Sequence, residues 1–204
     1  MAKQQPPAPP REALPDDEPN RYLGKVKASL CKRWSVSRMD PLYEIADLAA
    51  YLWALERPDE AVVIAEAVAT AVPAPPPLPR GGVNYSLWCP ATYSHALVAR
   101  LGTGVLPEQA GASRAAVLAD PGVARDNPRY VVNQVADARR VAAAPPDPRS
   151  MKWQCQGLAR AIGAMALYAE LGAAGDPLFA PHAEDAAAVI PQLLGRLGDR
   201  LRSA

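Results

Sequence analysis

Residues 41–73 read PLYEIADLAAYLWALERPDEAVVIAEAVATAVP. Two alanine-rich segments lie on either side of the turn Glu56-Arg57-Pro58, and Pro73 closes the second segment. In both segments the apolar residues recur at three- and four-residue steps, which places them on one face of a helix. The stretch therefore predicts a helical hairpin, and hairpins of this kind stack against further helices.

The composition of the whole chain favours the same fold class. Of the 204 residues, 50% are apolar but only 6% are aromatic, and there is one phenylalanine. Strands prefer β-branched and aromatic residues in alternation, and the sequence contains no convincing alternating run. We therefore expect an all-α protein whose helices pack closely around alanine, leucine and valine side chains.

Prolines divide the rest of the chain into segments, because proline interrupts the hydrogen-bond ladder of a helix. Residues 1–19 are expected to form a disordered proline-rich tail, and residues 20–204 a single helical domain with a proline-rich linker at 73–82. With the hairpin, the expected helices number seven or eight. The others are expected over residues 21–36, 85–101, 107–119, 128–143, 150–171 and 181–202.

Single residues mark where some of these helices should end or bend. Gly102 and Gly172 are expected to end the helices that precede them, since glycine readily adopts the left-handed conformation of a helix C-cap. Pro191 is expected to kink or split the last helix.

The hairpin resembles a tetratricopeptide (TPR) repeat. Leu48 and Ala49 stand where that motif has a leucine and a small residue on its first helix, and Ala61 takes the small position that opens the second helix. Pro73 matches the closing proline, whereas Ile45 replaces a large aromatic residue that is common in the motif. The resemblance covers about a sixth of the chain, and tandem repeats need several units to bury a continuous core. It implies TPR-like stacked hairpins that bind other proteins; an α/α bundle with one such hairpin is the alternative.

The same residues predict how the two helices of the hairpin pack. Small side chains at Ala49 and Ala61 let the two helix backbones approach closely. Leu48, Leu52 and Ile64 are then expected to fill the remaining space between the helices.

A second resemblance rests on overall character. Small, alanine-rich helical chains that carry such a hairpin and lack a catalytic signature look like bacterial immunity proteins, which neutralise a toxin by binding it. Many immunity proteins are strongly acidic, whereas this chain has a formal net charge of +1. The resemblance implies stoichiometric binding of another protein and assigns a role to no particular residue.

Cysteine usage and the lack of long apolar runs indicate a cellular location. Cys31, Cys89 and Cys155 are far apart and form no CxxC pair, so reduced thiols are expected. The N-terminus has no apolar signal region, and no run of about 18 apolar residues occurs. We therefore expect a cytoplasmic protein without a membrane span, and the abundance of alanine, arginine and proline favours a GC-rich bacterial source.

Aromatic and polar residues gather at positions 84–95, NYSLWCPATYSH. Tyrosine and tryptophan are favoured anchors at protein interfaces, so these residues are expected to line a binding groove. The alternative is that the rings are partly buried, with their polar tips hydrogen-bonded. The expected anchors come from this segment and from the hairpin, and they are Tyr85, Trp88, Tyr93, Trp53 and Tyr51.

No catalytic motif occurs in the sequence. Cys89 and His95 lie six residues apart, which places them about 120° apart around a helix and nearly two turns apart along it. They are therefore not expected to pair as nucleophile and base. His182 has acidic neighbours but lacks the further ligands of a metal site. We expect a non-enzymatic protein that requires no cofactor or metal.

Charge is unevenly distributed around the start of the hairpin. Residues 21–38 hold six basic and no acidic residues, and residues 40–70 hold seven acidic residues and one arginine. The two segments are expected to pack together and compensate each other. The alternative is a ligand- or nucleic-acid-binding regulator whose basic helix contacts phosphates through Lys25, Lys32 and Arg33. Against it, the acidic helix that follows would repel a nucleic acid.

The leading hypothesis is a protein that acts by binding another protein stoichiometrically, either as an immunity protein or as a helical adaptor. Its expected mechanism is occlusion of the partner by a rigid helical surface, with aromatic and arginine side chains as anchors.

Overall fold

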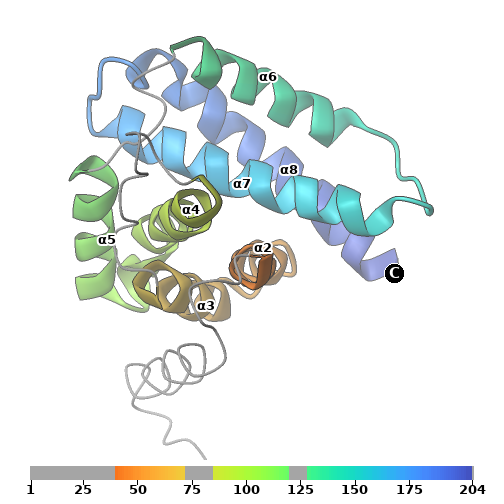
Figure 1. Cartoon of the computed structure of the whole chain (residues 1–204), viewed down its shortest axis with the longest axis horizontal. Coiled ribbons are helices and arrows are strands. Elements are labelled where there is room, and N and C mark those ends of the chain that lie inside the picture. The colour runs from red at the N-terminus through yellow and green to blue at the C-terminus, as the bar shows by residue number, and fades with distance from the viewer. Residues whose placement is uncertain (1–39, 72–84, 120–127, 204) are drawn as a thin grey trace, which may run out of the picture.

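The computed structural model describes residues 40–71, 85–119 and 128–203 (Figure 1). These residues form seven α-helices and two short 3₁₀ helices and contain no strand, which confirms the all-α class. The 3₁₀ helices are Gly102–Gly104 and Ala180–His182. The α-helices are α2 (Asp40–Ala54), α3 (Pro58–Ala71), α4 (Tyr85–Leu101), α5 (Pro107–Ala119), α6 (Pro128–Ala143), α7 (Met151–Ala173) and α8 (Ala183–Ser203).

Most helix boundaries fall where the prolines predict them, but the glycines act differently. Gly102 opens a 3₁₀ helix and is not left-handed, so it is not the predicted C-cap. α7 continues past Gly172, where α8 packs closely, and Gly175 is the left-handed residue of the following turn, with φ 83°. The predicted tail, the helix at 21–36 and the linker lie outside the described residues.

Pro191 neither ends nor splits α8, because the helix is continuous from Ala183 to Ser203. Pro191 itself is exposed, while Ile190 and Leu193 on either side are buried. The packing of these apolar side chains holds the helix together where proline removes one backbone hydrogen bond.

α7 lies at the centre of the described fold. It packs against α8, α4, α6 and α2, and these helices surround it in Figure 1. From Leu158 to Gly172 nearly all of its residues are buried, and many of them are alanine or glycine. Small side chains allow several helices to approach one axis closely.

α2 and α3 form the predicted hairpin, with a left-handed Glu56 (φ 62°) in the turn. Ala49 and Ala61 are fully buried, as the close approach of two backbones requires. Leu48, however, is 39% exposed, so the prediction that it fills the space between the helices was wrong. Its neighbours Asp47 and Ala49 face the interior instead, which turns Leu48 toward solvent.

The crossing of α4 over α7 depends on Gly163. A Cβ atom built on Gly163 would lie 2.8 Å from the Cβ atom of Tyr93, a distance that real side chains do not tolerate. A Cβ atom on Gly157, six residues earlier in the same helix, would meet nothing within 4 Å. Gly157 and Gly163 therefore have different roles, and of these two glycines only Gly163 sets a helix–helix distance.

Gly163→Ala should lower the free energy of unfolding by about 1–3 kcal/mol, because the added methyl group pushes α4 away from α7. Gly157→Ala is the matched control in the same helix, and it should be neutral or stabilise the protein by about 0.5–1 kcal/mol. Urea unfolding followed by circular dichroism measures both. Equal effects of the two substitutions would contradict this account of the α4–α7 crossing.

Candidate functional site

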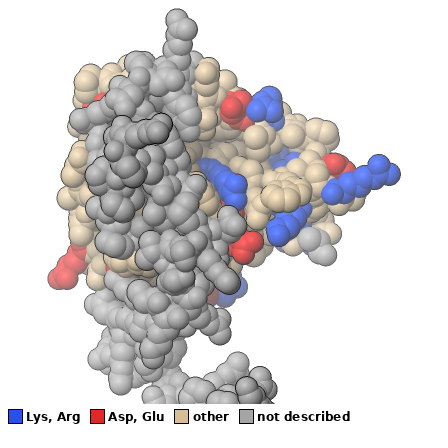
Figure 2. Space-filling view, viewed as in Figure 1, with Lys and Arg blue, Asp and Glu red and all other residues tan. Residues whose placement is uncertain are grey.

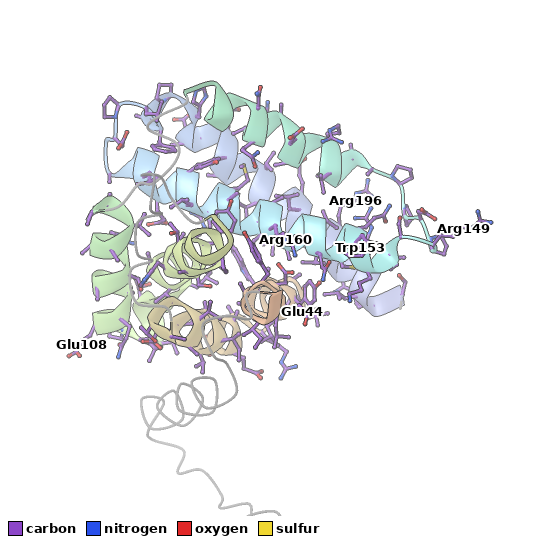
Figure 3. All side chains as sticks on the ribbon, viewed as in Figure 1. Glu44, Glu108, Arg149, Trp153, Arg160 and Arg196 are labelled. Atoms are coloured by element: carbon purple, nitrogen blue, oxygen red, sulfur yellow. The ribbon has the colours of Figure 1, made fainter. Side chains whose placement is uncertain are left out.

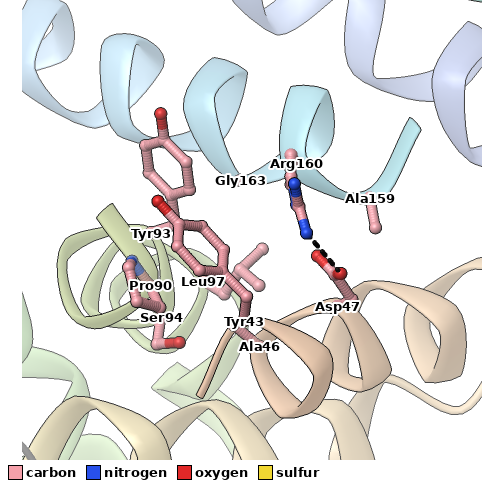
Figure 4. Close-up of a pocket in the computed structure, with 10 residues that line it drawn as sticks. All are labelled: Tyr43, Ala46, Asp47, Pro90, Tyr93, Ser94, Leu97, Ala159, Arg160 and Gly163. Atoms are coloured by element: carbon pink, nitrogen blue, oxygen red, sulfur yellow. Dashed lines mark ion pairs between the residues drawn. The ribbon is translucent and has the colours of Figure 1, made fainter. Parts of the chain in front are cut away.

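A polar crevice lies where α2, α4 and α7 meet (Figure 4). α2 contributes Tyr43 and Asp47, α4 contributes Tyr93 and Ser94, and α7 contributes Arg160. The space that remains for solvent is about 10 Å³, which is room for about one water molecule. The crevice therefore brings charged and aromatic groups together without a cavity of ligand size.

Asp47 and Arg160 form an ion pair across this crevice. The distance between Arg160 Nη2 and Asp47 Oδ2 is 3.7 Å, which is longer than a hydrogen bond (Figure 4). The Asp47 side chain is 3% exposed and the Arg160 side chain 44% exposed. Among the described residues, Asp47 Oδ2 has no hydrogen-bond partner. A buried carboxylate is therefore only loosely compensated by an arginine that reaches in from the surface.

Burial dominates the electrostatics of the crevice. It raises the pKa of Asp47 from 3.8 to about 7, although the Arg160 guanidinium acts in the opposite direction. Burial, reinforced by the nearby Asp47, also raises the pKa of Tyr51 to about 12. At neutral pH the Asp47 carboxyl group is therefore close to the midpoint of its titration.

Arg160 also contacts an aromatic ring. Its guanidinium carbon lies 4.7 Å from the ring centroid of Tyr43, within the range of a cation–π interaction. Arg160 thus joins α7 to two side chains of α2, Tyr43 and Asp47, and its other face remains open to solvent.

The structure places the predicted aromatic anchors in different surroundings. Tyr93 lines the crevice, Tyr51 lies half-buried near Asp47, and Trp53 is half-buried against the core. Tyr85 and Trp88 belong to α4, but their side chains lie outside the described part of the chain. The groove at residues 84–95 and the binding role of these five anchors therefore stay predictions.

The alternative basic patch of Lys25, Lys32 and Arg33 also lies outside the described residues. We expected the acidic segment 40–70 to neutralise this patch. One of its carboxylates, Asp47, instead pairs with Arg160 of α7. The sequence interpretation missed Arg160 and Asp47 because each stands alone among alanines and leucines. A charged residue inside an otherwise apolar helical pattern is the signal that could have identified them.

His95, the candidate base of a cysteine–histidine pair, has another neighbour. Its Nδ1 atom lies 3.0 Å from the hydroxyl oxygen of the buried Ser113 on α5. Burial lowers the pKa of His95, which favours the neutral ring. This contact joins α4 to α5, and the Cys89 side chain lies outside the described residues.

Trp153 is the most exposed large apolar side chain of the described residues. It is 70% exposed, whereas Leu48 and Leu118 are each 39% exposed. Figure 3 places it at the start of α7, at the same end of the molecule as Arg149. The space-filling view shows both basic and acidic side chains around an uncharged surface at this end (Figure 2). The sequence interpretation did not include Trp153 among the binding anchors.

No protein-family model, curated protein or solved structure matches the chain. Within the described ranges, no helix is long and apolar enough to cross a lipid bilayer. The same ranges contain no group of three or more histidine, cysteine, aspartate or glutamate side chains arranged to hold a metal ion.

Asp47→Asn should remove a pH dependence of stability. Because the folded-state pKa of Asp47 lies above its ordinary value, its contribution to stability is full below pH 3.8 and is lost as the pH rises to about 7. Over this window the wild type should lose up to about 4 kcal/mol of unfolding free energy relative to the variant. Urea unfolding at a series of pH values measures the difference.

Asp199→Asn is the control for this experiment. Asp199 is 70% exposed and pairs with Arg202 at the surface, so its replacement should leave the pH dependence nearly unchanged. If the stability of Asp47→Asn and of the wild type changes in parallel as the pH rises, folding does not raise the pKa of Asp47, contrary to this prediction.

Proposed function

We propose that this chain is a non-enzymatic protein that binds another protein stoichiometrically through a surface at the start of α7. The observation that carries the proposal is the 70% exposure of Trp153 on a helix that is otherwise the most deeply buried element of the fold. A large apolar ring held in solvent by a rigid helix costs hydration free energy, and covering it on binding recovers that free energy.

The neighbours of Trp153 fit this role. Trp153, Gly157 and Arg160 recur at steps of four and three residues, so they follow one face of α7 over about 10 Å. Tyr43 of α2 extends the same face through its contact with Arg160. We call these four residues the Trp153 surface. Tryptophan, tyrosine and arginine are the residue types that most often dominate binding energy at interfaces.

Gly157 gives the Trp153 surface a shape that a partner can use. A Cβ atom at Gly157 would have nothing within 4 Å, so the surface of α7 is open at this position, between residues 153 and 160. A partner side chain can enter this space and contact both residues. The aliphatic part of such a side chain would pack on the indole, while its polar end meets the arginine.

A bacterial immunity protein and a helical adaptor are both binders of this kind. The first would occlude a toxin, and the second would hold a partner for another reaction. The Trp153 surface supports either role, and the identity of the bound partner distinguishes them.

Trp153→Ala should weaken binding of the partner at least about tenfold, since truncation of a central aromatic anchor costs about 2 kcal/mol or more. Gly157→Leu should do the same by filling the open space, while leaving the fold intact. The measurement is capture of proteins from the source organism by the tagged full-length chain, quantified by mass spectrometry and followed by titration with the purified partner.

Leu118→Ala is the matched control, because Leu118 is an exposed apolar residue on α5, outside the Trp153 surface. The proposal predicts one stoichiometric partner that Leu118→Ala retains and that both α7 variants lose. A partner that all three variants bind equally would place the interface elsewhere and overturn the proposal.

A further inference from the structure

A groove of about 260 Å³ opens between the end of α6, the start of α7 and the end of α8, and it shares Trp153 and Gly157 with the Trp153 surface. Val141, Ala144 and Gly157 give it an apolar lining, and the indole of Trp153 forms one wall. Arg140 and Arg200 are the charged residues that line it, and no acidic side chain does so among the described residues.

Arg200 is an incompletely satisfied charge at this groove. The residue is 4% exposed, and its Nη2 atom donates a hydrogen bond of 2.8 Å to the carbonyl oxygen of Ala144. Its Nε and Nη1 atoms are shielded from solvent and have no hydrogen-bond partner in the described structure. A guanidinium stays charged in proteins, so burial leaves donors that need an acceptor.

The second arginine of the groove has an acidic partner and is open to solvent. Arg140 Nη2 lies 2.9 Å from Asp137 Oδ1, and both side chains are largely exposed. The uncompensated charge at the groove is therefore the single positive charge of Arg200. One negative charge with two acceptor oxygens would balance it, and a carboxylate has this charge and number of acceptors.

The rim of the groove is held in place by hydrogen bonds of the loop before α7. Gln154 Nε2 donates to the carbonyl oxygen of Pro145 at 3.1 Å, and the backbone amide of Asp147 donates to Gln154 Oε1 at 3.2 Å. The hydroxyl group of Ser150 donates to Asp147 Oδ2 at 2.7 Å. The shape of the groove therefore exists before a ligand arrives, which lowers the entropic cost of binding.

We propose that this groove binds a small organic carboxylate with an apolar body, whose carboxylate pairs with Arg200 and whose body packs on Trp153 and the apolar lining. The side chain of Arg200 must shift toward the groove for Nε or Nη1 to reach the ligand oxygens. Charge-assisted hydrogen bonds to the guanidinium favour this shift. This ligand site is additional to the protein-binding function proposed above, and its test requires no protein partner.

The test uses the full-length chain and the probe 4-phenylbutyrate, with 4-phenylbutyramide as an uncharged probe of nearly the same shape. Nuclear magnetic resonance follows the indole N–H signal of Trp153, which is assigned from the variant Trp153→Phe. The carboxylate should shift this signal in a saturable manner. The amide should bind at least about tenfold more weakly, because a charged hydrogen bond is lost.

Variants of two arginines on α8 complete the test. Arg200→Met keeps an unbranched apolar stem but removes the guanidinium, and it should weaken binding of 4-phenylbutyrate at least about tenfold. Arg202→Met, at an exposed residue that pairs with Asp199, should leave binding unchanged. Circular dichroism and thermal unfolding confirm that each variant is folded.

The proposal is overturned if the wild-type protein binds the carboxylate and the amide equally well, or if it binds neither. Retention of carboxylate affinity in a folded Arg200→Met variant would also overturn it. The comparison of two probes on the wild-type protein does not depend on the folding of any variant. If the protein does not prefer 4-phenylbutyrate to the amide but the Trp153 surface still captures a protein partner, only the proposed ligand site is wrong.

Discussion

The described fold depends on the close approach of several helices to one alanine- and glycine-rich helix, α7. Gly163 allows α4 to cross it, and Gly172 allows the start of α8 to lie against its end, where a Cβ atom would be 2.4 Å from the Cβ atom of Ala183. Gly198 of α8 similarly admits the carbonyl oxygen of Ala54. Because helices this close leave little space for side chains, the core consists mainly of small residues with a few large ones, such as Tyr168 and Phe179.

The same close packing places the polar groups of interest along the first half of α7. Asp47 lies on one side of this half-helix, and Arg200 lies on another. Between these two places Trp153 and Arg160 extend into solvent. The second half of α7 is buried among apolar residues and offers no comparable surface. The fold therefore concentrates exposed aromatic and incompletely paired charged groups at one end of a rigid scaffold.

The sequence predicts the helices well because their signals are local. Prolines at 58, 107 and 128 each stand at the first residue of a helix, where proline is tolerated, and the spacing of apolar residues marks the helix faces. The site was not predictable in the same way. Asp47 and Arg160 are 113 positions apart in the chain, and only the packing of α2 on α7 brings them together. The exposure of Trp153 likewise depends on where α7 begins relative to α6 and α8.

The two buried charges differ in how they can respond to burial. Asp47 can take up a proton, and its pKa of about 7 shows that the neutral form is accessible near physiological pH. Arg200 has no such option, because a guanidinium does not lose its proton in proteins. Loss of charge can therefore relieve the cost of burying Asp47, whereas only an acceptor can relieve the cost at Arg200. One hydrogen bond to Ala144 leaves two nitrogens of Arg200 without partners among the described residues, so each further acceptor that reaches them would lower the cost of burying this charge.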